Sequence, residues 1–121
     1  MARAAKSVEA YMPLFIGPYL ADTMHLSRDQ HGGYLLLLMA YWREGGPLPD
    51  DDAFLASVTK CSAVEWRKMR PVLARFFQIV DGRWTQKRAD AEIARALELK
   101  AKRTEAGETG AKKRWQTHSK G

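Results

Sequence analysis

The polar side chains best suited to chemistry form two small groups in the first half of the chain. In the first group, Asp22, His25, Asp29 and His31 are of the types that ligate metal ions. A helical metal site needs its ligands on one face, with histidines at positions i and i+4, and His25 and His31 lack that spacing. Helix capping and surface polarity explain these residues better, so we expect no metal site here.

The second group is the run Asp50-Asp51-Asp52, and acidic runs of this kind can hold the metal of a nuclease. Acidic residues at the start of a helix also accept hydrogen bonds from free backbone N–H groups and complement the helix dipole. Because the run directly follows Pro49, we favour this second interpretation, with Asp50 as the N-cap. The aspartates then imply a helix start and no metal.

Other catalytic signatures are missing from the sequence. It has no glycine-rich phosphate loop, no nucleophile elbow and no Cys-x-x-Cys pair. The single cysteine, Cys61, excludes an internal disulfide and suits a reducing cytosol; a small buried side chain is a simpler interpretation of it than an activated thiol. We therefore expect neither an enzyme nor a cofactor.

Basic residues are the stronger signal. The chain has 20 Lys and Arg against 14 Asp and Glu, a net charge of +6. Residues 60–75 hold five of these cations against Glu65 alone, and residues 86–121 hold ten against five acidic residues. Two basic blocks of this kind indicate a polyanionic partner such as nucleic acid. A merely solvated surface is the alternative.

A central helix is predicted over Arg28–Arg43. It opens on a capping box formed by Ser27 and Gln30, and Gly45-Gly46-Pro47 ends it. The stretch from Tyr34 to Trp42 is apolar around the whole helix, which is typical of the buried centre of a domain. Early in this helix, Gly32-Gly33 predicts close approach of another backbone, with 18–24 as the expected neighbour, or else a later helix start.

Further helices flank this centre. A short turn or helix from Gly17-Pro18 precedes it, a second helix runs from Asp50 to about Lys60, and a third covers about Ala63–Phe76. The third helix opens on a Ser62–Glu65 capping box, and Pro71 predicts a kink within it. Helical spacing separates an apolar side from a basic one. The apolar side comprises Trp66, Met69, Leu73, Phe76 and Phe77, and the basic side comprises Arg67, Lys68 and Arg75.

A hairpin and a long helix follow. Residues 78–85 alternate around Asp81-Gly82, a dipeptide that favours a two-residue hairpin turn. From about Gln86 a helix with an apolar stripe that includes Ile93 and Leu97 fades near Thr104. We thus expect a flexible leader over residues 1–11, a folded domain over 12–104 and a basic, glycine-containing flexible tail over 105–121.

This order predicts a mainly α fold with a small β-hairpin, a winged helix-turn-helix. In that architecture the last helix of the trio enters the DNA major groove and the wing touches the neighbouring backbone. The expected contacts with double-stranded DNA are therefore the cations of the third helix, the wing and the tail. They are Lys60, Arg67, Lys68, Arg70, Arg75, Arg83, Lys87, Arg88, Lys112, Lys113 and Arg114.

The sequence also resembles a known family. The run MPLFIGPYLADTMHLSRDQHGGYLLLLMAYWREGGPLPDDD, followed by AVEWRKMRPVLARFF, DGRW and RTEAGETGAKKRW, resembles the YdaU-like prophage family over about residues 12–115. That family is a domain of unknown function similar to the winged-helix N-terminal domains of phage replication initiators and replisome organisers. No catalytic residues are established for it, so the resemblance assigns none here.

Together these features predict a phage or prophage DNA-binding protein with a part in replication, such as origin recognition. A transcriptional regulator with the same fold is the close alternative, and an adaptor that binds a replication or host protein through the third helix or the Ile93/Leu97 stripe is another. No apolar run reaches the ~20 residues of a membrane helix. We expect a protein of the bacterial host cytoplasm with no membrane partner, and leave open whether it forms a homodimer.

Overall fold

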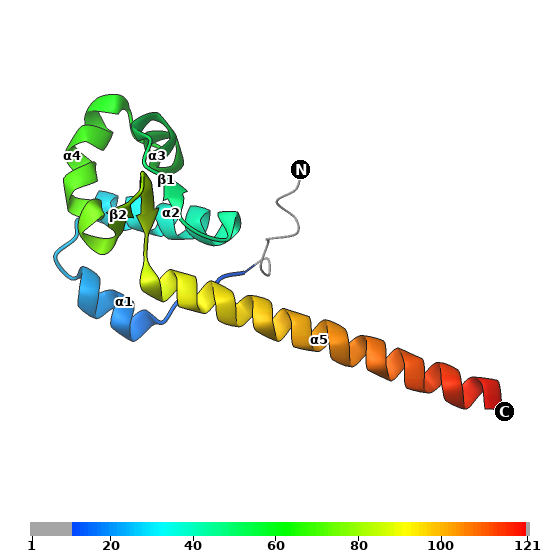
Figure 1. The fold of residues 1–121 in the computed structure, drawn as a ribbon. Helices are drawn as coiled ribbons and strands as arrows, with labels where there is room; N and C mark the ends of the chain where they lie inside the picture. The colour runs from blue at the N-terminus through cyan, green and yellow to red at the C-terminus, as the bar shows by residue number, and fades with distance from the viewer. Residues whose placement is uncertain (1–10, 121) are drawn as a thin grey trace.

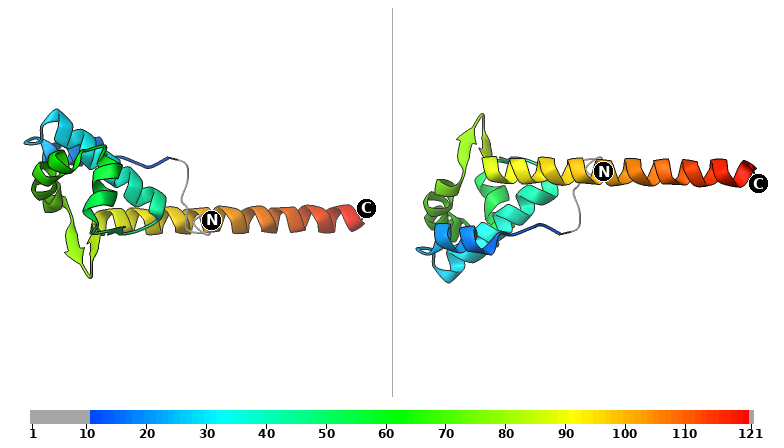
Figure 2. Two further views of the ribbon diagram at one scale, coloured as in Figure 1. Left: turned by 90° about the horizontal axis from the view of Figure 1, so that it is seen from above. Right: turned by 90° about the horizontal axis from the view of Figure 1, so that it is seen from below.

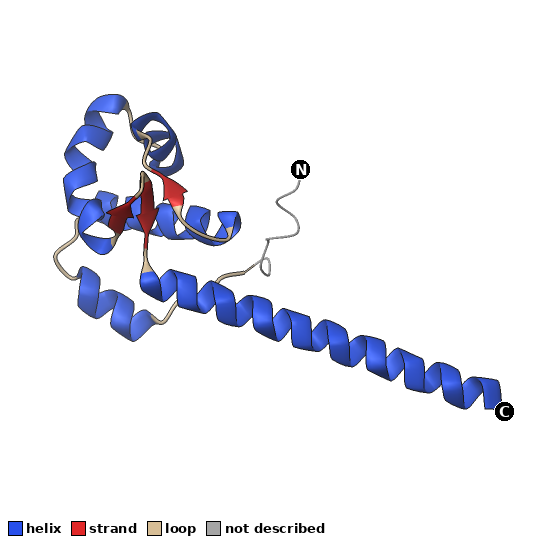
Figure 3. Cartoon of the chain, in the orientation of Figure 1, coloured by secondary structure: helices blue, strands red, loops and turns tan. Residues whose placement is uncertain are grey.

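The computed structural model describes residues 11–120, with side chains through residue 110. The fold is mainly α, as predicted, with a small antiparallel sheet (Figures 1 and 3). Its helices are α1 (Ile16–Thr23), α2 (Arg28–Glu44), α3 (Asp52–Thr59), α4 (Ala63–Leu73) and α5 (Lys87–Lys120), with a 3-10 turn, η2 (Ala74–Phe76), after α4. Its strands are β1 (Leu48–Pro49), β2 (Gln78–Val80) and β3 (Arg83–Thr85).

Helix α2 is the centre of the domain and contacts α3, α4 and α5. Its predicted capping box is present, because the Ser27 hydroxyl accepts from Gln30 N and the Gln30 side chain accepts from Ser27 N. Gly45 ends the helix in the left-handed conformation, φ 78°. The expectation of burial on every side is corrected: Met39 is 51% exposed, since no described element covers that side.

Helices α3 and α4 are joined by a three-residue turn, Lys60 to Ser62. Lys60 takes the left-handed conformation, φ 62°, to close α3. The Ser62–Glu65 capping box then starts α4, as predicted. The N-cap of α3 is corrected from Asp50 to Asp51, whose carboxylate accepts from the backbone N–H groups of the first turn. Asp50 is engaged elsewhere, as described below.

The predicted hairpin is formed by β2 and β3, with Ile79 opposite Trp84. Its turn residues Asp81 and Gly82 have φ of 51° and 69°, the paired positive angles of a tight hairpin turn. A third strand, β1, pairs with the other edge of β3 and places Leu48 beside Trp84. At two residues, β1 is too short to show strand alternation in the sequence.

Helix α5 leaves the body of the domain and projects well beyond it (Figures 1 and 2). Its first turns are anchored, because the Tyr41 hydroxyl accepts from Gln86 N and donates to Asp90, and Ile93 is buried. The predicted end near Thr104 is corrected: the helix continues to Lys120 in place of an irregular tail. Each interior glycine costs about 1 kcal/mol relative to alanine, but the neighbouring Ala, Glu, Lys and Arg are among the strongest helix formers.

The core is aromatic and lies where α2, α4 and the sheet meet. Trp84, Tyr41 and Leu37 are fully buried and Trp66 is 2% exposed. The rings of Trp66 and Trp84 lie 5.9 Å apart, and Phe77 packs 5.3 Å from Trp84. The described residues contain no helix long and apolar enough to cross a membrane. Of the leader predicted over 1–11, all but Tyr11 lies outside the described residues.

Candidate nucleic-acid interface

The inner face of α4 packs against α2 at close range. Trp66 and Leu73 are buried there, as the helical spacing predicted. At Gly33 of α2, an added Cβ would lie 2.5 Å from Met69 Sδ, whereas nothing lies within 4 Å of one at Gly32. The close neighbour of the glycine pair is therefore a side chain of α4, which corrects the expected approach of the 18–24 backbone. This contact fixes the helix so that its other face points to solvent.

The outer face of α4 presents the cations that sequence spacing placed there. Arg67 and Lys68 are exposed, and neither forms an ion pair within the described part of the chain. Lys60 is exposed in the turn that leads into α4, and Arg75 is exposed in η2. Lys60 and Lys68 line one groove, between α2, α3 and α4, and Arg67 lines another, between α3 and α4.

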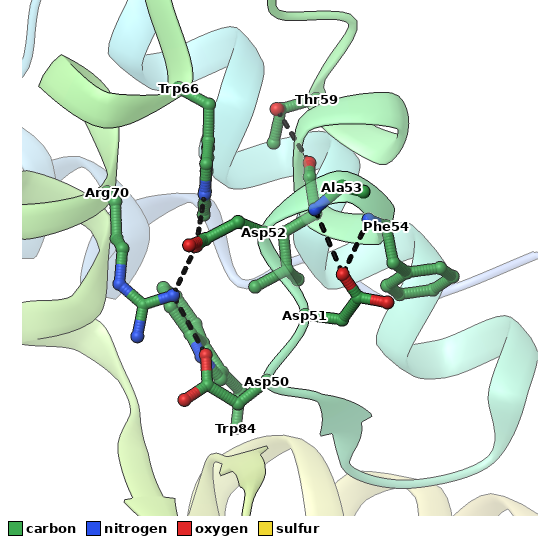
Figure 4. A network of polar contacts seen from close by, with 10 residues as sticks. Asp50, Asp51, Asp52, Ala53, Phe54, Thr59, Trp66, Arg70 and Trp84 are labelled. Carbon is green, nitrogen blue, oxygen red and sulfur yellow. Dashed lines mark hydrogen bonds and ion pairs between the residues drawn. The ribbon is translucent and has the colours of Figure 1, made fainter. Parts of the chain in front are cut away.

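Arg70 lies on the same helix but is engaged with the protein itself (Figure 4). Its Nη1 donates to Asp50 Oδ1 at 2.8 Å and to Asp52 Oδ1 at 2.6 Å. Its guanidinium carbon lies 5.3 Å from the centre of the Trp84 ring. The hydrogen bond to Asp50 is the main reason that the pKa of Arg70 is raised. Its charge is thus compensated within the fold, unlike that of Arg67.

Two indoles complete this arrangement. Trp84 Nε1 donates to Asp50 Oδ1 at 2.9 Å, and Trp66 Nε1 donates to Asp52 Oδ1 at 2.9 Å. The hydrogen bond from Arg70, then that from Trp84, lowers the pKa of Asp50. The hydrogen bond from Trp66, then that from Arg70, lowers the pKa of Asp52. We call these five residues, Asp50, Asp52, Trp66, Arg70 and Trp84, the Arg70 cluster.

The sequence identified the aspartates and Arg70 as candidate residues, but it did not predict that they contact each other. The aspartates were assigned to capping and to the helix dipole; Asp51 is the N-cap and Asp52 lies in the first turn of α3, so only Asp50 has neither role. One sequence signal could have indicated these contacts. A single N-cap uses one carboxylate, so a run of three aspartates leaves carboxylates that can pair elsewhere. Their partners lie 14 to 34 residues further along the chain, so the pairing depends on tertiary structure.

The hairpin supplies a second exposed basic region. Arg83 of β3 and Lys87 at the start of α5 are exposed and form no ion pair among the described residues. Arg88 differs, because its Nη1 lies 3.5 Å from Asp22 of α1. In both views of Figure 2 the hairpin projects from the helical body. The hairpin therefore lies at the edge of the helical body, where Gly82 O of its turn accepts from Asp50 N.

The remaining predicted residues of the tail lie beyond the described side chains. Lys112, Lys113 and Arg114 belong to the helical backbone of α5, but their side chains fall outside the described residues.

The residues first considered for chemistry have other neighbours. His31 Nδ1 lies 3.0 Å from the Tyr19 hydroxyl, and the His25 ring stacks 6.0 Å from Phe76. Cys61 is half-buried, with Sγ 3.8 Å from Met69 Sδ. Over residues 11–110, no group of three or more His, Cys, Asp or Glu side chains is placed to hold a metal ion.

The fold and its surface define a small, mainly helical domain that presents cations on one helix and one hairpin. The chain belongs to the family described as protein of unknown function DUF1376, whose model matches residues 10–94. It is 38% identical over 104 residues to the uncharacterized protein YdaU of Escherichia coli strain K12. This confirms the resemblance seen in the sequence.

The match to YdaU covers 86% of this chain and 36% of that protein. The chain therefore spans about a third of the length of this curated relative. No solved structure matches the chain.

Proposed function

We propose that the chain is a winged helix-turn-helix domain that binds double-stranded DNA. In this proposal α3 and α4 are the helix-turn-helix, α4 is the recognition helix, and the β2–β3 hairpin is the wing. The observation that carries it is that Arg67 and Lys68 are exposed on α4 and have no carboxylate partner among the described residues, whereas Arg70 of the same helix has two. Unpaired cations on a helix held rigidly at the surface suit contact with phosphates and base edges.

The arrangement of the elements supports the proposal. The three-residue turn between α3 and α4 has the length typical of helix-turn-helix units. The outer face of α4 combines Arg67 with Val64, which is 55% exposed. Arginine can bind guanine through two hydrogen bonds, and an apolar side chain can contact the thymine methyl group. Arg83 and Lys87 near the wing would bind phosphates, which adds affinity without sequence preference.

We further propose a role in phage or prophage replication, such as origin recognition. This part rests on the family resemblance to the N-terminal domains of replication initiators, since fold alone does not determine function. Transcriptional control by the same interface is the alternative within DNA binding. Mapping the preferred site relative to the gene of the chain separates an origin from an operator.

The test is fluorescence anisotropy with duplex DNA across a salt series, using an Arg67→Ala/Lys68→Ala double variant. The control is Arg43→Ala/Lys100→Ala, which removes the same charge from exposed positions outside α4 and the hairpin. We expect the α4 variant to lose at least about tenfold in affinity. The slope of log K against log salt should fall by about 0.9 for each phosphate that the variant no longer neutralises. Folding should be unchanged, because both side chains are exposed.

The control should bind almost as tightly as the unmodified chain. Equal losses in the two double variants would show that net charge acts without a defined interface. If the α4 variant is folded and binds duplex DNA with unchanged affinity, α4 is not part of the DNA interface. If the unmodified chain binds no duplex at low salt, the proposal that it binds DNA is wrong.

One observation favours an adaptor as the second candidate. Ile16 and Leu20 of α1 and its C-cap residue Met24 recur every four residues and are 66%, 54% and 83% exposed. An apolar stripe of this kind suits a protein partner, such as a replication or host protein or a second copy of the chain. The Ile93/Leu97 stripe first considered is a poorer candidate, because Ile93 is 4% exposed. Arg67→Glu/Lys68→Glu should abolish duplex binding if the interface is DNA, and leave an α1-bound protein partner unaffected.

A further inference from the structure

We propose that Arg70 is a positioning residue that sets the hairpin against α4 for DNA binding, through Asp50, Asp52 and Trp84. This inference rests on the proposed function and goes beyond it. It gives Arg70 a role different from that of its neighbours Arg67 and Lys68. It also makes two acidic residues, which would repel a phosphate backbone, necessary for binding that backbone.

The geometry joins three elements through one guanidinium (Figure 4). Arg70 comes from α4, the two aspartates come from the junction of β1 and α3, and Trp84 comes from the hairpin strand β3. A single Nη1 atom of Arg70 reaches both carboxylates, at 2.8 and 2.6 Å. Asp50 also holds the hairpin directly, through the Trp84 indole and through its own N–H, which donates to Gly82 O at 2.9 Å.

An isolated exposed ion pair would be too weak for this role, since such pairs contribute little. The Arg70 cluster differs because each carboxylate accepts from a guanidinium and from an indole that is itself buried. Trp84 is fully buried and Trp66 is 2% exposed, so the two indole N–H groups are fixed in place. Connected groups of this kind hold a geometry better than separate pairs do.

The consequence for DNA binding is pre-organisation. A wing and a recognition helix that contact the same duplex must keep their separation, and a loosened hairpin would have to be ordered during binding. The strand β1 pairs with β3 at only two residues, Trp84 and Arg83, next to the turn of the hairpin. The Arg70 cluster adds the contact between the hairpin and α4.

The test compares three neighbouring substitutions, Asp50→Asn, Asp51→Asn and Asp52→Asn, in duplex anisotropy measurements on the full chain. All three remove one negative charge. Asp51→Asn is the matched control, because asparagine is also a good N-cap and residue 51 lies outside the Arg70 cluster. We expect Asp50→Asn and Asp52→Asn each to weaken binding, by up to about tenfold. Asp51→Asn should bind as tightly as the unmodified chain or slightly more tightly.

The sign of the effect separates this proposal from simple electrostatics. If Arg70 were a phosphate contact held back by the aspartates, removing a carboxylate would release it and strengthen binding. If the cluster contributed only global stability, all variants would bind equally well at temperatures far below their unfolding midpoints, which circular dichroism establishes. Either result overturns the proposal.

Arg70→Lys and the double variant Asp50→Asn/Arg70→Lys complete the experiment. Lysine keeps the charge but lacks the planar fork and the stacking, so Arg70→Lys should weaken binding although a phosphate contact would tolerate it. The double variant should be no weaker than the single ones, because both act on one contact. Additive losses would overturn the proposal. Absence of duplex binding by the unmodified chain would instead reject the proposed function, which keeps the two failures distinct.

Discussion

Two arginines of α4, Arg67 and Arg70, lie one turn apart and carry the same charge under opposite conditions. Arg70 contacts two carboxylates and lies over the Trp84 ring; we call the Arg70 cluster the inner side of this comparison. Arg67 is exposed and forms no ion pair among the described residues; we call it and the other such cations the outer side. The comparison teaches that a basic block in a sequence divides into cations that the fold itself pairs and cations that stay exposed at the surface.

The same division applies to the other predicted cations. Arg88 forms an ion pair with Asp22 of α1. In contrast, Lys60, Lys68 and Arg83 form no ion pair among the residues with described side chains. We therefore expect substitutions on the inner side to change stability first, and substitutions on the outer side to change DNA binding first. Three predictions sharpen this contrast.

The largest effect is expected at Trp84, on the inner side. Trp84→Ala removes a fully buried ring and the hydrogen bond to Asp50, and should destabilise the fold by about 3–5 kcal/mol. Trp84→Phe is the control, since it keeps an aromatic ring but lacks the N–H, and should cost less. Urea denaturation measures both. A Trp84→Ala variant as stable as the unmodified chain would contradict the account of the inner side.

A smaller effect of opposite sign is expected at Lys60, on the outer side. Its φ of 62° strains a lysine but not a glycine, so Lys60→Gly should stabilise the fold by about 1 kcal/mol. Lys60→Ala removes the same charge and keeps the strain. The two variants should lose DNA affinity equally while differing in their thermal midpoints. Unequal affinities would show that the turn geometry, and not the charge, acts in binding.

The smallest effect is expected from pH. The pKa values of Asp50 and Asp52 are lowered from an ordinary 3.8, so both carboxylates are more acidic in the folded state. Their stabilising contribution is complete above that ordinary value and is lost as the pH falls through the lowered ones. The thermal midpoint of the unmodified chain should therefore drop more steeply below about pH 4 than that of Asp50→Asn/Asp52→Asn. If the thermal midpoints of the two proteins fall in parallel as the pH is lowered, the ionised carboxylates of Asp50 and Asp52 do not stabilise the fold.

Much of the fold could be predicted because its signals are local. Capping boxes at Ser27 and Ser62 and the Asp81-Gly82 turn depend on residues at most three positions apart, and all are present. The two-residue strand β1 gave no periodic pattern. The C-terminal extent of α5 was underestimated because glycines were weighed above the helix formers around them.

The candidate interface could be predicted only in part. Helical spacing placed Arg67 and Lys68 correctly on the side opposite Trp66. Helical spacing could not show that Arg70 differs from these two residues. The two carboxylate partners of Arg70 are 18 and 20 residues away in the chain, and they contact Arg70 only because α3 packs on α4. Assigning a charge to the fold or to a partner requires knowing what lies beside it in space.

The most direct test of the central claim is an NMR titration of the ¹⁵N-labelled chain with duplex DNA, which reports each backbone amide separately. We expect the largest shift changes over residues 63–68 of α4 and 81–83 of the hairpin, with few changes in α1 or at the end of α2. Changes centred on the α1 stripe, or none at low salt, would contradict the account and favour the adaptor.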